Sequence, residues 1–347
     1  MFSPLFSYLL IPFLVAMFLA INMGGSGTAP SFSAAYGANI IRRFTIPGIF
    51  GLCVFAGAIL AGKKVSLTMG RDLIHPDQMT MVVTTIVLLS MALALFFANL
   101  FAVPQSTSQS AVFSLVGAAL YFGKYNFHML LTEILPIWFV LPILAFILML
   151  GICKAYEYFK QKWLFKNIIQ PNERITKIMV LISACYVAFS IGANNVANAA
   201  GPLAGMVMHE LGIEPSDERS FVIVVIMATL LIAPCFAIGS SLFGSRLLRA
   251  TGKGITAFGY KGAIAISFVT ASLLLLASIT KGIPTSLVQL NTFAILALGV
   301  SKEGWKNALF NGVLHKFGII WLAAPFFSFV VSFLLMWACD SLGMLQW

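Results

Sequence analysis

Apolar stretches of about 20 residues recur along the whole chain, for example at residues 79–103 and 127–153. A helix of about 20 residues crosses a hydrocarbon core of about 30 Å. Of the 347 residues, 60% are hydrophobic and 9% are charged, which leaves too little polar surface to cover a water-soluble protein. The sequence therefore predicts an all-α integral membrane protein that crosses the cell (cytoplasmic) membrane several times.

Basic residues are concentrated in short connections between these apolar stretches. The net charge is +10, but pairs such as Arg42–Arg43 and Lys63–Lys64 follow the usual pattern of membrane loops rather than that of a nucleic-acid-binding surface. Residues 154–177 carry six Lys and Arg against two acids and are predicted to be cytoplasmic. Residues 1–20 lack a basic leading region, so we interpret them as a first transmembrane helix rather than a cleaved signal.

The five cysteines and four histidines show no metal-ligand spacing. The cysteines lie in or at the ends of apolar segments and are predicted to be free thiols. No motif of a nucleotide-binding protein or hydrolase is present, and a membrane enzyme would need acids or histidines clustered at one depth. We expect no metal, no cofactor and no enzymatic activity.

The two halves of the chain resemble each other in sequence. Residues 62–71 align with residues 244–253 at an offset of 182, and Pro104 with Gln109 aligns with Pro284 with Gln289 at an offset of 180. Further matches pair Ile137, Trp138 and Pro142 with Ile320, Trp321 and Pro325, and residues 22–29 with residues 190–197. We predict a first transmembrane repeat at residues 1–156, a basic cytoplasmic connection at 157–175 and a second transmembrane repeat at 176–347.

Each half contains six apolar segments, of which two are short and begin with small or polar residues. Short segments of this kind cross lipid badly unless protein or a water-filled cavity surrounds them. If they are re-entrant or broken, the number of crossings becomes odd and the repeats are inverted, with a binding site where they meet near the membrane midplane. If all six cross, the repeats are parallel. The segments are 5–23, 24–40, 45–61, 79–103, 104–122 and 127–153, then 176–191, 192–208, 220–243, 262–280, 284–300 and 313–338, with 24–40, 104–122, 192–208 and 284–300 short.

The polar openings of the four short segments are the candidate site. A helix that begins inside the membrane presents unpaired N–H groups and the positive end of its dipole, which favour an anion. The alternative is that small residues pack helices together and that Ser and Thr bond to their own backbone. The predicted substrate-binding residues are Gly25, Ser26, Gly27, Thr28, Ser106, Thr107, Ser108, Asn194, Asn195, Thr285 and Ser286.

Glu133 is the one acid that lies well inside a long apolar segment, and the repeat pairs it with Lys316. Ionisable residues inside a membrane often carry ions or protons. We predict that Glu133 takes and releases a coupling proton while Lys316 balances its charge. The alternative is that both are interfacial residues near helix ends.

Residues 192–203, Gly-Ala-Asn-Asn-Val-Ala-Asn-Ala-Ala-Gly-Pro-Leu, resemble the GANDVANA signature of the inorganic phosphate transporter (PiT) family. Residues 104–109 resemble its P-x-S-T-T/S motif and residues 244–256 its G-R/K-x-x-x-T-x-G-K-x-I/L-T block. The resemblance covers nearly the whole chain. It implies an inverted-repeat transporter, usually a homodimer, with oxyanion and coupling-ion sites at the signature segments.

The chain departs from the family signature at two acidic positions. Where the family carries an Asp in each half, this sequence has Gly27 and Asn195, and Ser26 and Pro30 replace Asn residues in the first half. A carboxylate suits Na⁺ or a protonated phosphate but repels sulfate, which has only acceptors at neutral pH. The pattern resembles the bacterial sulfate permease branch of the family.

We therefore predict a secondary active transporter that imports inorganic sulfate by alternating access. Protons are the expected coupling ion. An inorganic phosphate or other tetrahedral oxyanion symporter remains the first alternative, and an anion channel is an alternative of a different class, since a pH gradient would not drive its flux uphill.

Overall fold

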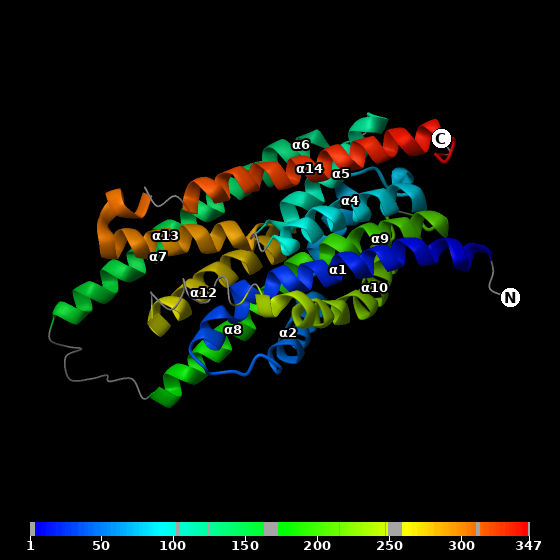
Figure 1. The fold of residues 1–347 in the computed structure, drawn as a ribbon. Helices are drawn as coiled ribbons and strands as arrows, with labels where there is room; N and C mark the ends of the chain where they lie inside the picture. Colours follow the sequence, from blue (N-terminus) through cyan, green and yellow to red (C-terminus); the bar gives the residue numbers. More distant parts are fainter. Residues whose placement is uncertain are drawn as a thin grey trace.

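Long helices lie side by side and form the whole bundle of this computed structural model (Figure 1). The structure describes residues 4–101, 105–123, 125–162, 173–214, 216–246, 248, 259–309 and 313–345. In chain order the helices are α1 (Pro4–Gly37), α2 (Ile46–Ala61), α3 (Lys63–Leu67), η1 (Thr68–Asp72), η2 (Pro76–Gln78), α4 (Met81–Leu100), α5 (Thr107–Phe122), α6 (Phe127–Met129), η3 (Leu130–Ile134), α7 (Leu135–Gln161), α8 (Glu173–Asn195), α9 (Ala197–Glu210), α10 (Glu218–Gly239), η4 (Ser240–Gly244), α12 (Gly259–Leu276), η5 (Ala277–Lys281), α13 (Leu287–Leu309) and α14 (Val313–Ser341).

Seven stretches of helix within the described ranges are long and apolar enough to cross a membrane. An eighth is added if α2 and the helix at 63–72 count as one span, although they are bent by 74°. The bend falls at Gly62 and leaves Lys63 in an ion pair with Glu218, at 2.8 Å. The predicted multi-pass, all-helical architecture is confirmed.

The polar residues of the first short segment do not open a new helix. Residues 24–37 continue α1 without a break, although Pro30 lies inside it and lacks a backbone donor. The Ser26 hydroxyl donates to the Met23 carbonyl at 3.0 Å, and the Thr28 hydroxyl donates to the Gly24 carbonyl at 2.7 Å. These hydroxyls are satisfied by their own helix, as polar groups in lipid must be, and the helix therefore persists.

The counterpart in the second half is also not a helix start. Residues 192–195 form the last turn of α8, and α9 begins after the single residue Val196, so the predicted segment 192–208 is wrong at its boundary. The other two short segments do begin new helices, although α5 and α13 begin three residues after the predicted starts at 104 and 284. Ser106 caps α5, and the Ser286 hydroxyl accepts from the Gln289 amide at the start of α13.

Two close helix crossings repeat the same glycine contacts. Gly57 and Gly192 lie where α2 crosses α8, and Gly239 and Gly24 lie where α10 crosses α1. A Cβ on any of the four would lie 1.8–2.2 Å from a carbonyl oxygen of the facing helix, so only glycine permits this approach. The helices α1 and α8 run in opposite directions through the bundle, as do α7 and α14 (Figure 1).

Candidate transport site

A small cavity lies where the beginnings of α5 and α13 meet the middle of α1 and the last turns of α8. Its volume is about 20 Å³, more than the roughly 10–15 Å³ that one water molecule needs. Five of the predicted site residues line it, namely Ser26, Gly27, Ser106, Thr107 and Asn195. The remaining lining residues are Pro30, Gln105, Ile191, Leu287 and Val288.

The first turn of α5 offers hydrogen-bond donors to this cavity. Its first intrahelical bond runs from the Ser110 amide to the Ser106 carbonyl, so the Thr107 and Ser108 amides precede the helical ladder. The Ser106 hydroxyl accepts from the Gln109 amide at 3.2 Å, which leaves its own proton available to donate. Thr107 and Ser106 are 7% and 2% exposed, so a bound anion would be largely shielded from water.

Gln105 also lines the cavity, and the sequence prediction missed it. Its Nε2 donates to the Ser110 hydroxyl at 2.6 Å, while its Oε1 is buried with no partner among the described residues. Turning the amide by 180° keeps the bond to Ser110, with the hydroxyl as donor, and frees two N–H donors. The signal in the sequence was its place between Pro104 and Ser106, although Pro104 itself lies outside the described residues.

A buried network around Asn194 fixes the loop before α13. The Asn194 Oδ1 accepts from the Ser108 hydroxyl at 2.9 Å and from the Thr285 amide at 3.2 Å. Its Nδ2 donates to the Ser278 hydroxyl at 2.9 Å. From the other side, the Trp138 Nε1 donates to the Pro284 carbonyl at 2.7 Å. Asn194, Ser108 and Thr285 thus stabilise the segments around the cavity but do not line it.

The equivalent glutamines of the two halves bond to each other. Gln109 Nε2 donates to Gln289 Oε1 at 3.1 Å, and Gln289 Nε2 donates to Gln109 Oε1 at 3.3 Å. Each lies three residues after its helix cap, Ser106 or Ser286, and the two glutamines are 180 residues apart. The reciprocal pair joins α5 to α13 beside the cavity.

Other predicted residues lie elsewhere. Gly25 packs against the Phe243 side chain, and Thr28 packs against Gly244, both on the side of α1 that contacts η4. Ser286 serves as the cap of α13. Glu133 is exposed on η3 and is absent from the cavity wall. Lys316 belongs to α14, but its side chain lies outside the described part of the structure.

Comparisons with known proteins agree with this architecture. The sequence profile described as the phosphate transporter family matches residues 23–332. The sulfate permease CysP of Bacillus subtilis (strain 168) is 33% identical over 325 residues, which cover 93% of this chain and 85% of that protein. The putative phosphate permease TK2061 of Thermococcus kodakarensis is 24% identical over 402 residues, covering 94% and 97%.

A solved structure titled "The sodium-dependent phosphate transporter" has the same fold. Its TM-score is 0.83 at 21% sequence identity, and the match covers 96% of this chain and 99% of that one. The helices and the profile match define a multi-pass membrane permease for anions. The chain belongs to the phosphate transporter family, and the predicted family is confirmed.

Proposed function

We propose that this chain is a secondary transporter that imports inorganic sulfate with protons as the coupling ion. The observation that carries the proposal is the composition of the cavity wall. Gly27 and Asn195, the two positions where the family signature has Asp, both line the cavity. The described residues that bound the cavity present hydroxyls, amides and apolar groups, and none of them is ionisable.

This wall suits a fully deprotonated oxyanion. Sulfate carries two negative charges and only accepts hydrogen bonds, so it gains from hydroxyl and amide donors and from the N-terminus of α5. A buried carboxylate would repel it. A Na⁺ ion prefers charged oxygen ligands, so their absence from these two positions favours the proton as coupling ion. The 33% identity to a protein named as a sulfate permease supports the same choice.

We further propose that the two halves are inverted repeats that rock about the cavity. The opposite directions of α1 and α8 and of α7 and α14 support inversion (Figure 1). The repeated glycine crossings and the reciprocal pair of Gln109 and Gln289 support equivalence of the halves. A site between two inverted halves can open to one side of the membrane at a time. A homodimer is expected from the family resemblance alone and stays a prediction.

Uptake of labelled sulfate into proteoliposomes tests the function. We expect a proton gradient to drive uphill sulfate accumulation that unlabelled sulfate abolishes and phosphate leaves largely unchanged. Phosphate uptake without sulfate-competed uptake would refute the sulfate assignment and leave the phosphate alternative. Downhill flux that ignores the gradient would indicate a channel.

The proton-coupling role of Glu133 needs its own test. We expect Glu133→Gln to abolish gradient-driven accumulation but retain sulfate exchange at equal pH, because exchange needs no net proton movement. Glu157→Gln is the matched control, since Glu157 is also an exposed carboxylate on the same stretch of helix. Unchanged gradient-driven uptake by Glu133→Gln would show that the coupling proton binds elsewhere.

A further inference from the structure

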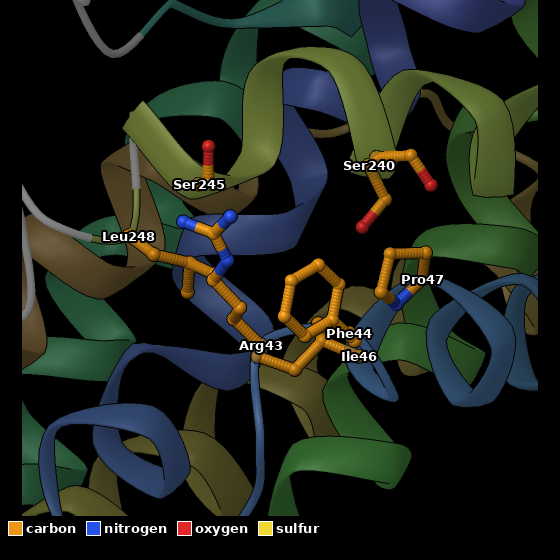
Figure 2. A pocket seen from close by; sticks show the side chains of 8 residues that line it. Arg43, Phe44, Ile46, Pro47, Ser240, Ser245 and Leu248 are labelled. Carbon is orange, nitrogen blue, oxygen red and sulfur yellow. The ribbon is translucent and has the colours of Figure 1, made fainter.

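A larger cavity lies between the α1–α2 connection and η4, with a volume of about 230 Å³ (Figure 2). The connection contributes Arg43 and Phe44, the first turn of α2 contributes Pro47, and the segment at and after η4 contributes Ser240, Ser245 and Leu248. None of the described residues that line it is acidic. Because Arg43 lies in the polar connection between two apolar helices, the cavity is expected at the level of the lipid headgroups.

Arg43, a charged residue at this cavity, lies beside an aromatic ring. The Arg43 Cζ lies 4.7 Å from the centroid of the Phe44 ring, within the range of a cation–π contact. In Figure 2 the guanidinium lies between Phe44 and Ser245, on the same opening as Ser240. A guanidinium presents a planar fork of donors that matches phosphate and sulfate oxygens.

Ser240 supplies an independent sign that this cavity takes a ligand. Its side chain is 3% exposed and its hydroxyl has no hydrogen-bond partner among the described residues. Buried hydroxyls almost always find a partner, so this hydroxyl is available to donate to a group bound in the cavity. Ser240 is also the first residue of the π-helix η4, and π-helical turns occur frequently at functional sites.

We propose that this cavity is a second oxyanion site that binds a tetrahedral phosphate or sulfate group through Arg43 and Ser240. The group is either a free anion or the headgroup of an anionic lipid. The site is distinct from the transport cavity and does not depend on the sulfate proposal. α1 lies between the transport cavity and η4, because Gly25 and Thr28 face η4 while Ser26 and Gly27 face the transport cavity.

Equilibrium dialysis of the purified full-length chain in uncharged detergent, with labelled sulfate and then labelled phosphate, tests the free-anion source. We expect Arg43→Ala to weaken one class of sites by at least about 10-fold, because a hydrogen bond to a charged group is lost. Arg42→Ala is the matched control. It removes the neighbouring exposed arginine, which does not line the cavity, and should leave binding unchanged.

Native mass spectrometry of the same variants in phosphatidylglycerol tests the lipid source. Loss of one retained phosphatidylglycerol in Arg43→Ala, but not in Arg42→Ala, assigns the cavity to a lipid headgroup. If neither anion binding nor lipid retention distinguishes Arg43→Ala from Arg42→Ala, the proposal is wrong.

Ser240→Ala separates ligand binding from folding. The hydroxyl has no partner in the described structure, so its removal should leave the unliganded melting temperature unchanged or higher. Affinity at the second site should nevertheless fall about 10-fold. A lower melting temperature with unchanged affinity would overturn the role of Ser240. If anion or lipid binding at the second site persists in Asn195→Asp, the second site is independent of the transport cavity.

Discussion

Replacing Asn195 with aspartate tests the sulfate argument with the smallest possible change. The substitution exchanges one NH₂ for an oxygen on a side chain that is 6% exposed and lines the cavity, so volume and packing are nearly preserved. What changes is the charge that faces the substrate. The variant also restores the acid that the family signature carries at this position.

The size of the effect follows from two competing costs. A carboxylate about 5 Å from a dianion is repelled by about 7 kcal/mol at an effective dielectric constant of about 20. Protonating the carboxyl instead costs about 4 kcal/mol at pH 7, from an aqueous pKa of about 3.9 at about 1.4 kcal/mol per pH unit. The lower of the two costs, that of protonation, sets the loss of sulfate-binding free energy. Burial already favours the neutral carboxyl, so this loss is at most about 4 kcal/mol. Sulfate affinity should therefore fall by up to about 10³-fold at pH 7.

The pH dependence has a definite sign. As pH falls the carboxyl is protonated, the repulsion disappears, and the penalty decreases by about 1.4 kcal/mol per pH unit. At pH 5.5 it is about 2 kcal/mol, or roughly 40-fold. The ratio of variant to parent sulfate uptake, measured in proteoliposomes at each internal and external pH, removes the parent's own pH profile.

Asn195→Ala is the matched control, because it removes the amide without adding charge. It should lower uptake by about 10-fold at most and without pH dependence in the ratio. If Asn195→Asp transports sulfate as well as the parent at pH 7, the missing carboxylate does not determine the substrate. Equal size-exclusion profiles of the variants are required for the comparison.

Three further predictions concern the packing that surrounds the site. Gly57→Ala should destabilise the chain by about 1–3 kcal/mol in thermal unfolding, because its Cβ would lie 1.9 Å from a carbonyl oxygen of α8. Gly48→Ala is the control and should be neutral, because open space surrounds its Cβ. Equal melting temperatures of the two variants would contradict the close crossing. Gln109 and Gln289 should be replaced with alanine singly and together in a double-mutant cycle of unfolding. We expect a coupling energy of about 1 kcal/mol from their reciprocal hydrogen bonds. If the two changes in unfolding free energy are additive, the pair contributes nothing to stability. Trp138→Phe should lower the free energy of unfolding by about 1–3 kcal/mol and reduce uptake, because it leaves the Pro284 carbonyl before α13 without its donor. Unchanged uptake would show that this loop does not need the hydrogen bond.

Hydropathy predicted the helices because lipid allows few alternatives. Most predicted segments match helices within a few residues, as at α2 and α4. The errors fell at residues 24–40, where glycines and hydroxyls suggested a helix start, and at 192–208, where a glycine and asparagines did. Those glycines instead serve close helix crossings, as at Gly24 and Gly192, and the hydroxyl of Thr28 bonds to its own helix. A local pattern of small and polar residues does not distinguish these uses, because the facing helix decides between them.

The candidate site was only partly predicted, because some of its features are local in sequence and others depend on distant helices. Ser106 was recognisable because capping is a local property of the sequence. Gln105 was missed because its importance depends on a cavity formed by helices distant in sequence. Arg43 and Ser240, which line the second cavity, were not connected because almost 200 residues separate them.

The sequence by itself determined that this chain crosses a membrane several times and to which family it belongs, and it predicted that the two halves are related. These properties follow from composition, segment length and motifs, each of which is local. Only the tertiary structure decided which polar residues face the cavity and which face a neighbouring helix. That division depends on the crossing of α1 with α10 and of α8 with α2, where glycines bring backbones into contact and turn Ser26 and Asn195 toward one shared space.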